Sequence, residues 1–232
     1  MRELPLRALP RVFVPGASSE GLIELPKEEI DKLRKVLRLS GGAQIAVLPN
    51  DGSIIRCEFT GRDAIPIQVE HPNVEAQFKL TVAQNLPKGD KLDEIVRACT
   101  ELGVVKFLLF PSERTIVKWD QKKVADRLVR IQAIAREAAE VSFRTILPTF
   151  VYLPSLKELL MQNPRATVLS EVQDESKKLT KVGTEMTIVV GPEGGWSIRE
   201  LELIGDRGVT LGPRVLRVDH AGPAAAAILL LS

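Results

Sequence analysis

The spacing of apolar residues changes along this chain and divides it into two predicted regions. In the first region, short apolar segments alternate with turns, and the segments 45–48 and 54–59 flank an Asn-Asp-Gly turn in the pattern of a β-hairpin. One helix is predicted among these strands, over residues 26–39. We therefore expect a small β-barrel domain over residues 1–72, with its linker at His71-Pro72-Asn73.

In the second region, residues 73–232, predicted strands alternate with predicted helices. Four apolar segments have the length and composition of buried strands: 80–84, 104–110, 166–169 and 186–190. Three predicted helices begin at Asp90, Gln121 and Ser155. The helix from Asp90 repeats apolar residues at i, i+3, i+4 and i+7, and Gly103 is placed to end it. The alternation is typical of an α/β domain with a mostly parallel sheet.

Two loops rich in glycine and proline are the strongest candidates for a ligand site. The first, Gly191-Pro-Glu-Gly-Gly195, runs from a predicted strand to a helix start, because Ser197 and Glu200 have the spacing of a capping box. The second is Leu211-Gly-Pro-Arg-Val-Leu-Arg217. Glycine lets the backbone approach a ligand closely, so the pair indicates a site built mainly from main chain. For either loop alone, a plain turn is the alternative, and neither matches a P-loop or a dinucleotide fingerprint.

Composition narrows the class of protein. Aliphatic side chains must form the core, since 44% of the 232 residues are hydrophobic and only 4% are aromatic. The cysteines, Cys57 and Cys99, and the histidines, His71 and His220, are too few and too scattered to predict a disulfide framework or a metal site. The longest apolar run, 224–231, is too short to span a membrane, and the N-terminus lacks a secretory signal pattern. We therefore expect a cytoplasmic protein.

Basic residues form short ridges on two of the predicted helices. Arg34 and Arg38 share one face of the first helix, beside the predicted inward positions Leu33 and Leu37. A similar ridge on the long helix consists of Lys123, Arg127 and Arg130. Each ridge suits nucleic-acid phosphates, and a solvated helix face is the alternative. The net charge of +2 does not decide between them.

A series of short motifs lies in order along nearly the whole chain: Arg11-Val-Phe-Val-Pro15, Lys35-Val-Leu-Arg-Leu39, Leu86-Pro-Lys-Gly-Asp90, Thr100-Glu-Leu-Gly-Val104, Ser112-Glu-Arg114, Arg136-Glu-Ala-Ala139 with Ser142 and Arg144, and the two glycine-rich loops. The series resembles the RsmE family, the ribosomal RNA small subunit uracil-N3 methyltransferases of the SPOUT, or trefoil-knot, class. The two loops together are more specific than either alone.

The resemblance implies an N-terminal PUA-like barrel that binds RNA and a C-terminal α/β domain that is tied in a trefoil knot and forms a homodimer. It implies S-adenosylmethionine as the methyl donor and no metal. The substrate it implies is 16S rRNA within the 30S subunit. Carried over to this chain, the cofactor residues are Leu169, Ser170, Glu171, Gly191, Pro192, Glu193, Gly194, Gly195, Leu211, Gly212, Val215, Leu216 and Arg217. The expected RNA contacts are Arg11, Arg34, Arg38, Arg114 and Arg144.

Methylation of uracil N3 sets chemical requirements that few residues near the second loop can meet. The N3 proton must be lost, so the site needs a proton acceptor and a group that stabilises the anionic base. Arg217 is the candidate for stabilising charge on a uracil oxygen, and Asp219 or His220 for accepting the proton. Val218, Asp219 and His220 stand where the family usually has Thr-Glu-Thr, and Val141 replaces a customary glutamine.

These departures leave other functions open. Methylation of a ribose 2′-oxygen and a non-catalytic role in RNA binding or ribosome assembly are the alternatives. Pro223 suits the first turn of a final helix, and the run 224–231 is apolar all round, so we expect that helix to be buried in the core or against a second subunit.

Overall fold

The computed structural model describes residues 4–170 and 177–231, and the chain divides into two compact units. One unit consists of residues 1–75 and 139–147, and the other of residues 76–138 and 148–232. The expected boundary after residue 72 left residues 139–147 in the second domain. They belong instead to the first unit, because side chains such as Ala139 and Phe143 join its hydrophobic core.

The first unit is built on a five-stranded sheet with the order β1-β3-β4-β5-β2. Its strands are β1 (Arg11–Phe13), β2 (Ile23–Glu24), β3 (Ala43–Leu48), β4 (Ile54–Phe59) and β5 (Asp63–Glu70). The expected hairpin is confirmed, since β3 and β4 pair antiparallel and Asn50 between them has a left-handed backbone with φ 70°. Strands β1 and β3 run parallel.

The helix predicted over residues 26–39 is shorter than expected and changes its winding. It consists of α1 (Lys27–Asp31) and a π-helical segment (Lys32–Val36). Leu33 is fully buried as predicted, but Leu37 is 43% exposed, so its inward placement was wrong. The helical segment ends at Val36, so Leu37 is the cap residue after it, and the left-handed backbone of Arg38 (φ 55°) turns the chain away there. A 3-10 turn (Leu6–Ala8) precedes the sheet.

Glu75 connects two parts of the first unit that are far apart in the sequence. Its carboxylate accepts hydrogen bonds from Arg144 Nη2 at 2.8 Å and from the main-chain N–H groups of Thr145 and Ile146 at 2.8 and 3.2 Å. Burial raises the pKa of Glu75, but the charge of Arg144 and these hydrogen bonds outweigh it and lower the pKa overall. A satisfied ion pair therefore fastens the returning segment.

The second unit is built on a six-stranded parallel sheet with the order β11-β9-β10-β6-β7-β8. Its strands are β6 (Lys79–Asn85), β7 (Lys106–Phe110), β8 (Thr149–Tyr152), β9 (Thr167–Leu169), β10 (Glu185–Val190) and β11 (Gly208–Val209). The expected α/β class is confirmed. Strands β8 and β11 were not predicted, because one is not fully buried and the other is only two residues long.

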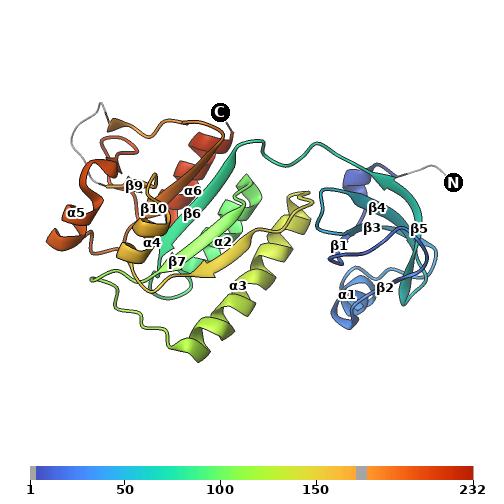
Figure 1. Ribbon diagram of the computed structural model, residues 1–232. Coiled ribbons are helices and arrows are strands. Elements are labelled where there is room, and N and C mark those ends of the chain that lie inside the picture. Colours follow the sequence, from blue (N-terminus) through green and yellow to red (C-terminus); the bar gives the residue numbers. More distant parts are fainter. Residues whose placement is uncertain (1–3, 171–176, 232) are drawn as a thin grey trace. The chain divides into compact units, whose positions relative to one another are not determined.

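Helices cover both faces of this sheet (Figure 1). They are α2 (Lys91–Leu102), α3 (Gln121–Val141), α4 (Leu156–Gln162), α5 (Ile198–Ile204) and α6 (Val218–Leu230), with a 3-10 turn at Gly205–Arg207. One core joins residues of α2, α3 and α6, and another joins residues of α4 and α5. Helix α6 begins at Val218, so Pro223 lies inside it and not in its first turn as expected. None of the helices in the described ranges is long and apolar enough to cross a membrane.

Candidate functional site

The carboxyl ends of three neighbouring strands bring the two glycine-rich loops to one edge of the parallel sheet. Ser170 follows β9, Gly191 follows β10, and the loop that begins at Thr210 follows β11. Ligands of open α/β sheets bind at this edge. The predicted capping box starts α5 directly after the first loop: Ser197 Oγ accepts from the N–H of Glu200 at 3.1 Å, and the N–H of Ser197 donates to the Glu200 carboxylate at 2.9 Å.

Trp196 forms the base of the first loop. Its side chain is 8% exposed, stacks on Phe110 with ring centroids 6.4 Å apart, and donates from Nε1 to the carbonyl oxygen of Leu169 at 3.2 Å. A Cβ at Gly191 would lie 2.8 Å from two indole carbons, closer than real Cβ atoms approach. Packing against Trp196 therefore requires glycine at 191, and the indole links the ends of β9 and β10.

Two cations hold the first loop through its own polar groups. The carboxylate of Glu193 accepts from Lys91 Nζ at 2.9 Å and from the main-chain N–H of Lys88 at 3.3 Å. Arg114 donates from Nη1 to the carbonyl oxygen of Gly194 at 2.7 Å. Burial raises the pKa of Glu193, but the hydrogen bond from Lys91 and main-chain hydrogen bonds lower it overall, so the carboxylate is ionised at neutral pH.

Buried polar side chains fix the segment that carries Arg114. Asn85 is fully buried and donates from Nδ2 to Thr115 Oγ1 at 2.8 Å and to the carbonyl oxygen of Phe110 at 3.2 Å. Glu200, 3% exposed, accepts from the N–H of Glu113 at 3.0 Å in addition to its capping bond. The loop after β7 is thus tied both to β6 and to the start of α5.

The second loop presents main chain and exposed apolar side chains. Gly212 donates its N–H to Thr210 Oγ1 at 3.1 Å, and its left-handed backbone (φ 128°) turns the chain there. The side chains of Val215 and Leu216 are 71% and 39% exposed. Within the described ranges, their main-chain N–H groups donate to no acceptor. Such a loop offers hydrogen-bond donors and an apolar surface to a ligand.

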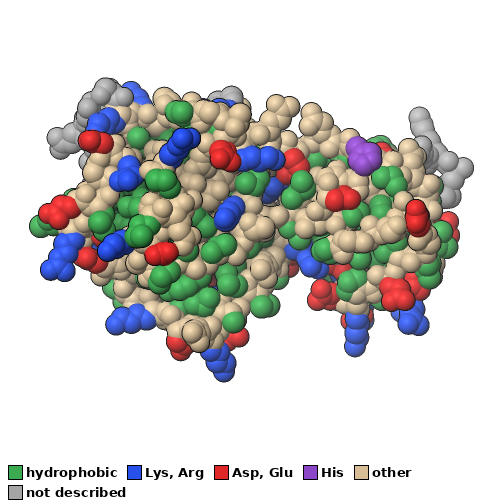
Figure 2. All heavy atoms as spheres, viewed as in Figure 1, with side chains coloured by type: hydrophobic (Ala, Val, Ile, Leu, Met, Phe, Trp, Pro, Cys, Tyr) green, Lys and Arg blue, Asp and Glu red, His purple; other side chains and the backbone are tan. Residues whose placement is uncertain are grey.

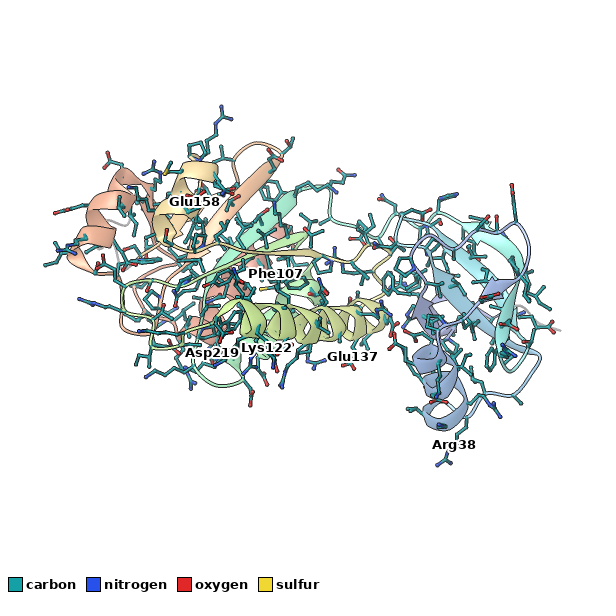
Figure 3. All side chains as sticks on the ribbon, turned by 60° about the horizontal axis from the view of Figure 1, so that its bottom comes forward. Arg38, Phe107, Lys122, Glu137, Glu158 and Asp219 are labelled. Atoms are coloured by element: carbon teal, nitrogen blue, oxygen red, sulfur yellow. The ribbon has the colours of Figure 1, made fainter. Side chains whose placement is uncertain are left out.

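Arg217, Asp219 and His220 lie together at the start of α6, where Figure 3 labels Asp219. Asp219 Oδ1 is 3.3 Å from Arg217 Nε, and Asp219 Oδ2 is 3.8 Å from His220 Nε2. The Asp219 side chain is 17% exposed, whereas those of Arg217 and His220 are 70% and 67% exposed. In the part of the chain that is described, the buried Oδ1 accepts no hydrogen bond, so its contact with Arg217 is purely ionic.

The charges around Asp219 determine its protonation. Burial raises its pKa, but its own main-chain N–H and the charges of Arg217, His220 and Lys91 lower it overall. Asp219 is therefore an anion at neutral pH, placed between two side chains that reach solvent.

Comparison with known proteins agrees with this geometry. A family model described as an RNA methyltransferase domain matches residues 74–230. A ribosomal RNA small subunit methyltransferase E from Bacillus subtilis is 34% identical over 214 residues, which cover 84% of this chain and 84% of that protein. The chain belongs to the ribosomal RNA small subunit methyltransferase E family.

Two further family members extend the likeness. The protein of the same name from Synechocystis is 32% identical over 93% of this chain and 75% of its own length. A solved structure of the Neisseria gonorrhoeae member, bound to S-adenosyl methionine, is 28% identical, covers 94% of this chain and 95% of its own, and has a TM-score of 0.85.

The arginines expected to contact RNA divide into two groups in this member of the family. The prediction that Arg144 contacts RNA was wrong. Its side chain is 4% exposed and paired with Glu75, so it does not present its guanidinium to RNA. Arg11 is half-buried and donates to the carbonyl oxygens of Glu140 and Arg7, so it too is engaged within the first unit.

The remaining expected RNA contacts lie at the surface. Arg114 is exposed beside the first loop, and Arg34 and Arg38 are exposed on the first unit, where Arg38 points outward (Figure 3). On the face drawn in Figure 2, Lys and Arg side chains are interspersed with Asp and Glu and form no single basic patch. The distribution of charged side chains on that face therefore does not indicate where RNA binds.

The structure brings most of the expected cofactor residues to the strand ends, and it adds others. Leu169 ends β9 and Ser170 follows it, whereas Glu171 lies outside the described residues. Lys91 and Asn85 were not predicted as site residues, although each has an unusual position in the sequence. Lys91 is a cation in the first turn of a helix, where anions are favoured, and Asn85 is an amide at the end of an apolar strand. No group of His, Cys, Asp and Glu side chains among the described residues could hold a metal ion.

Proposed function

We propose that this protein transfers a methyl group from S-adenosylmethionine to N3 of a uridine in 16S rRNA. Membership of the family supports the reaction, and the pairing of the two glycine-rich loops at one sheet edge is the observation that carries it to these residues. The cluster of Arg217, Asp219 and His220 beside the second loop supports proton abstraction from a base.

The residues of this edge fit S-adenosylmethionine. A Cβ at Gly191 would collide with Trp196, so this position of the first loop is restricted to main chain. Val215 and Leu216 offer main-chain donors and apolar surface, which suits an adenine ring and its polar edge. The cofactor residues of the proposal are therefore those of β9's end, the first loop and the second loop, as carried over from the family.

When bound, S-adenosylmethionine supplies an electrophilic methyl group on sulfur. The protein then has three tasks: to stabilise the anionic base, to accept its proton and to align the reacting atoms. Arg217 places its guanidinium against a uracil oxygen and stabilises the negative charge that develops there. His220 accepts the N3 proton, and Asp219, anionic and in contact with both neighbours, orients them. The loops hold N3 in line with the methyl group, which removes much of the entropic barrier.

The proposal also includes three finer features of the family: a trefoil knot in the second unit, a PUA-like RNA-binding barrel in the first, and a homodimer acting on the 30S subunit. The TM-score of 0.85 with the Neisseria gonorrhoeae member supports the first two. Exposed apolar side chains on α5 and α6, Ile198 at 75% and Ile228 at 43%, support a second copy packing there.

The test is methyl transfer to unmodified 30S subunits from labelled S-adenosylmethionine, with the product mapped by mass spectrometry. We expect label on uracil N3, and Arg217→Met to lower the rate by roughly a hundredfold or more. Arg165→Met is the matched control, since Arg165 is exposed at the amino end of β9, away from the loops. Label on a ribose oxygen would overturn the N3 assignment. Binding of RNA without binding of S-adenosylmethionine would overturn catalysis altogether.

A further inference from the structure

Lys91 carries a positive charge at a position of a helix that disfavours cations. It is the first residue of α2, and the N-terminus of a helix favours anions and disfavours cations. Its partner is Glu193 of the first glycine-rich loop, 2.9 Å away, and both side chains are 31% exposed. Glu193 also accepts the N–H of Lys88 from the same turn. The turn between β6 and α2 therefore holds the loop by both main chain and side chain.

The Lys91 side chain is more enclosed than the cations of the catalytic cluster. Arg217 and His220 are 70% and 67% exposed, whereas Lys91 is 31% exposed and paired with Glu193. Together with Arg217 and His220, Lys91 lowers the pKa of Asp219.

We propose that Lys91 is a positioning residue for methyl transfer, which fixes the cofactor loop through its ion pair with Glu193. The inference rests on the proposed function for its catalytic meaning. Its consequence, a preorganised loop, is measurable on the protein without RNA.

Three variants test the ion pair. Lys91→Met and Glu193→Gln each remove it, and Lys91→Arg keeps it. Lys88→Met is the matched control, because it removes an exposed charge from the same turn while its main-chain N–H to Glu193 stays.

The readout for each folded variant is affinity for S-adenosylmethionine, measured by calorimetry. Lys91→Met and Glu193→Gln should each weaken affinity about tenfold, the scale of one charge-assisted hydrogen bond. Lys91→Arg should restore the affinity, and Lys88→Met should leave it unchanged.

The results discriminate sharply. If Lys91→Met binds S-adenosylmethionine as tightly as Lys88→Met does, the inference is overturned. If the unaltered protein does not bind S-adenosylmethionine at all, the proposed function itself fails. The two failures are therefore distinguishable in the same calorimetric series.

Discussion

Replacement of Gly191 by alanine tests how the first loop is built. The added Cβ would lie 2.8 Å from two carbons of the Trp196 indole, about 0.7 Å short of the closest ordinary carbon–carbon contact. The indole has little freedom to retreat, because it is buried, stacked on Phe110 and bonded to the carbonyl oxygen of Leu169. The strain must therefore spread into the ends of β9 and β10.

The expected cost is that of overpacking a core, about 1–3 kcal/mol. For a unit of this size, a loss of 1 kcal/mol lowers the melting temperature by roughly 2–4 °C. The hydrogen bond from Trp196 to Leu169 should lengthen as the ring shifts. Since Leu169 ends the strand beside the proposed cofactor wall, affinity for S-adenosylmethionine should fall as well.

Gly194→Ala is the matched control, because its Cβ would meet only Arg114 methylene carbons at 3.7 and 3.8 Å, which is ordinary contact. Scanning calorimetry should show a clear shift for Gly191→Ala and almost none for Gly194→Ala. In a Trp196→Phe background the clash is relieved, so the cost of Gly191→Ala should shrink. Equal shifts for the two glycine variants, or full additivity with Trp196→Phe, would refute the packing argument.

The remaining predictions concern the first unit and the thiols. Glu75→Gln should cost about 3 kcal/mol of stability at pH 7, because it removes the carboxylate that pairs with the buried guanidinium of Arg144. Folding lowers the pKa of Glu75 below its ordinary value of 4.5, so the stabilisation is fully present above pH 4.5 and is lost as the pH falls through the pKa of the folded state. Urea unfolding between pH 6 and pH 3 should therefore show a steeper loss of stability for the unaltered protein than for the variant. Cys57 and Cys99 are fully buried, and burial raises the pKa of Cys57 to about 12 and that of Cys99 further; a thiol reagent at pH 8 should label neither until urea is added. Arg38→Gln should weaken RNA binding and lower the slope of log affinity against log salt by about one, and an unchanged slope would remove Arg38 from the RNA surface.

Local patterns predicted those elements whose residues decide their own conformation. The apolar repeat of α2 ends at Gly103, whose φ of 106° only glycine adopts readily, and the capping box of Ser197 and Glu200 forms as its spacing indicates. Strand β11 escaped prediction because its two residues become a strand only by pairing with β9. The start of α6 was misplaced because proline was assigned to a first turn, whereas Pro223 is tolerated five residues into the helix.

Long-range partners account for the errors at the candidate site. Nothing local distinguishes Arg144, which pairs with a carboxylate 69 positions away, from Arg38, which reaches solvent. The same limit hid Lys91, whose partner Glu193 is 102 positions distant. Ion pairs between distant segments depend on the fold as a whole, so residue type and spacing alone do not assign them.

The departures at 218–220 have a different meaning once burial is known. Val218 is 7% exposed and belongs to the core that α6 shares with α2 and the sheet. Valine in place of a polar residue therefore adds apolar contact to this core and takes no polar group from the solvent-facing side. The polar side chains needed for proton transfer are supplied by the next two residues, Asp219 and His220. Pro223 has no N–H to donate to the carbonyl of Asp219, four residues earlier, so the helix lacks one main-chain hydrogen bond next to this cluster. Asp219 contacts both Arg217 and His220, so replacement of either neighbour by a neutral residue should raise the pKa of Asp219.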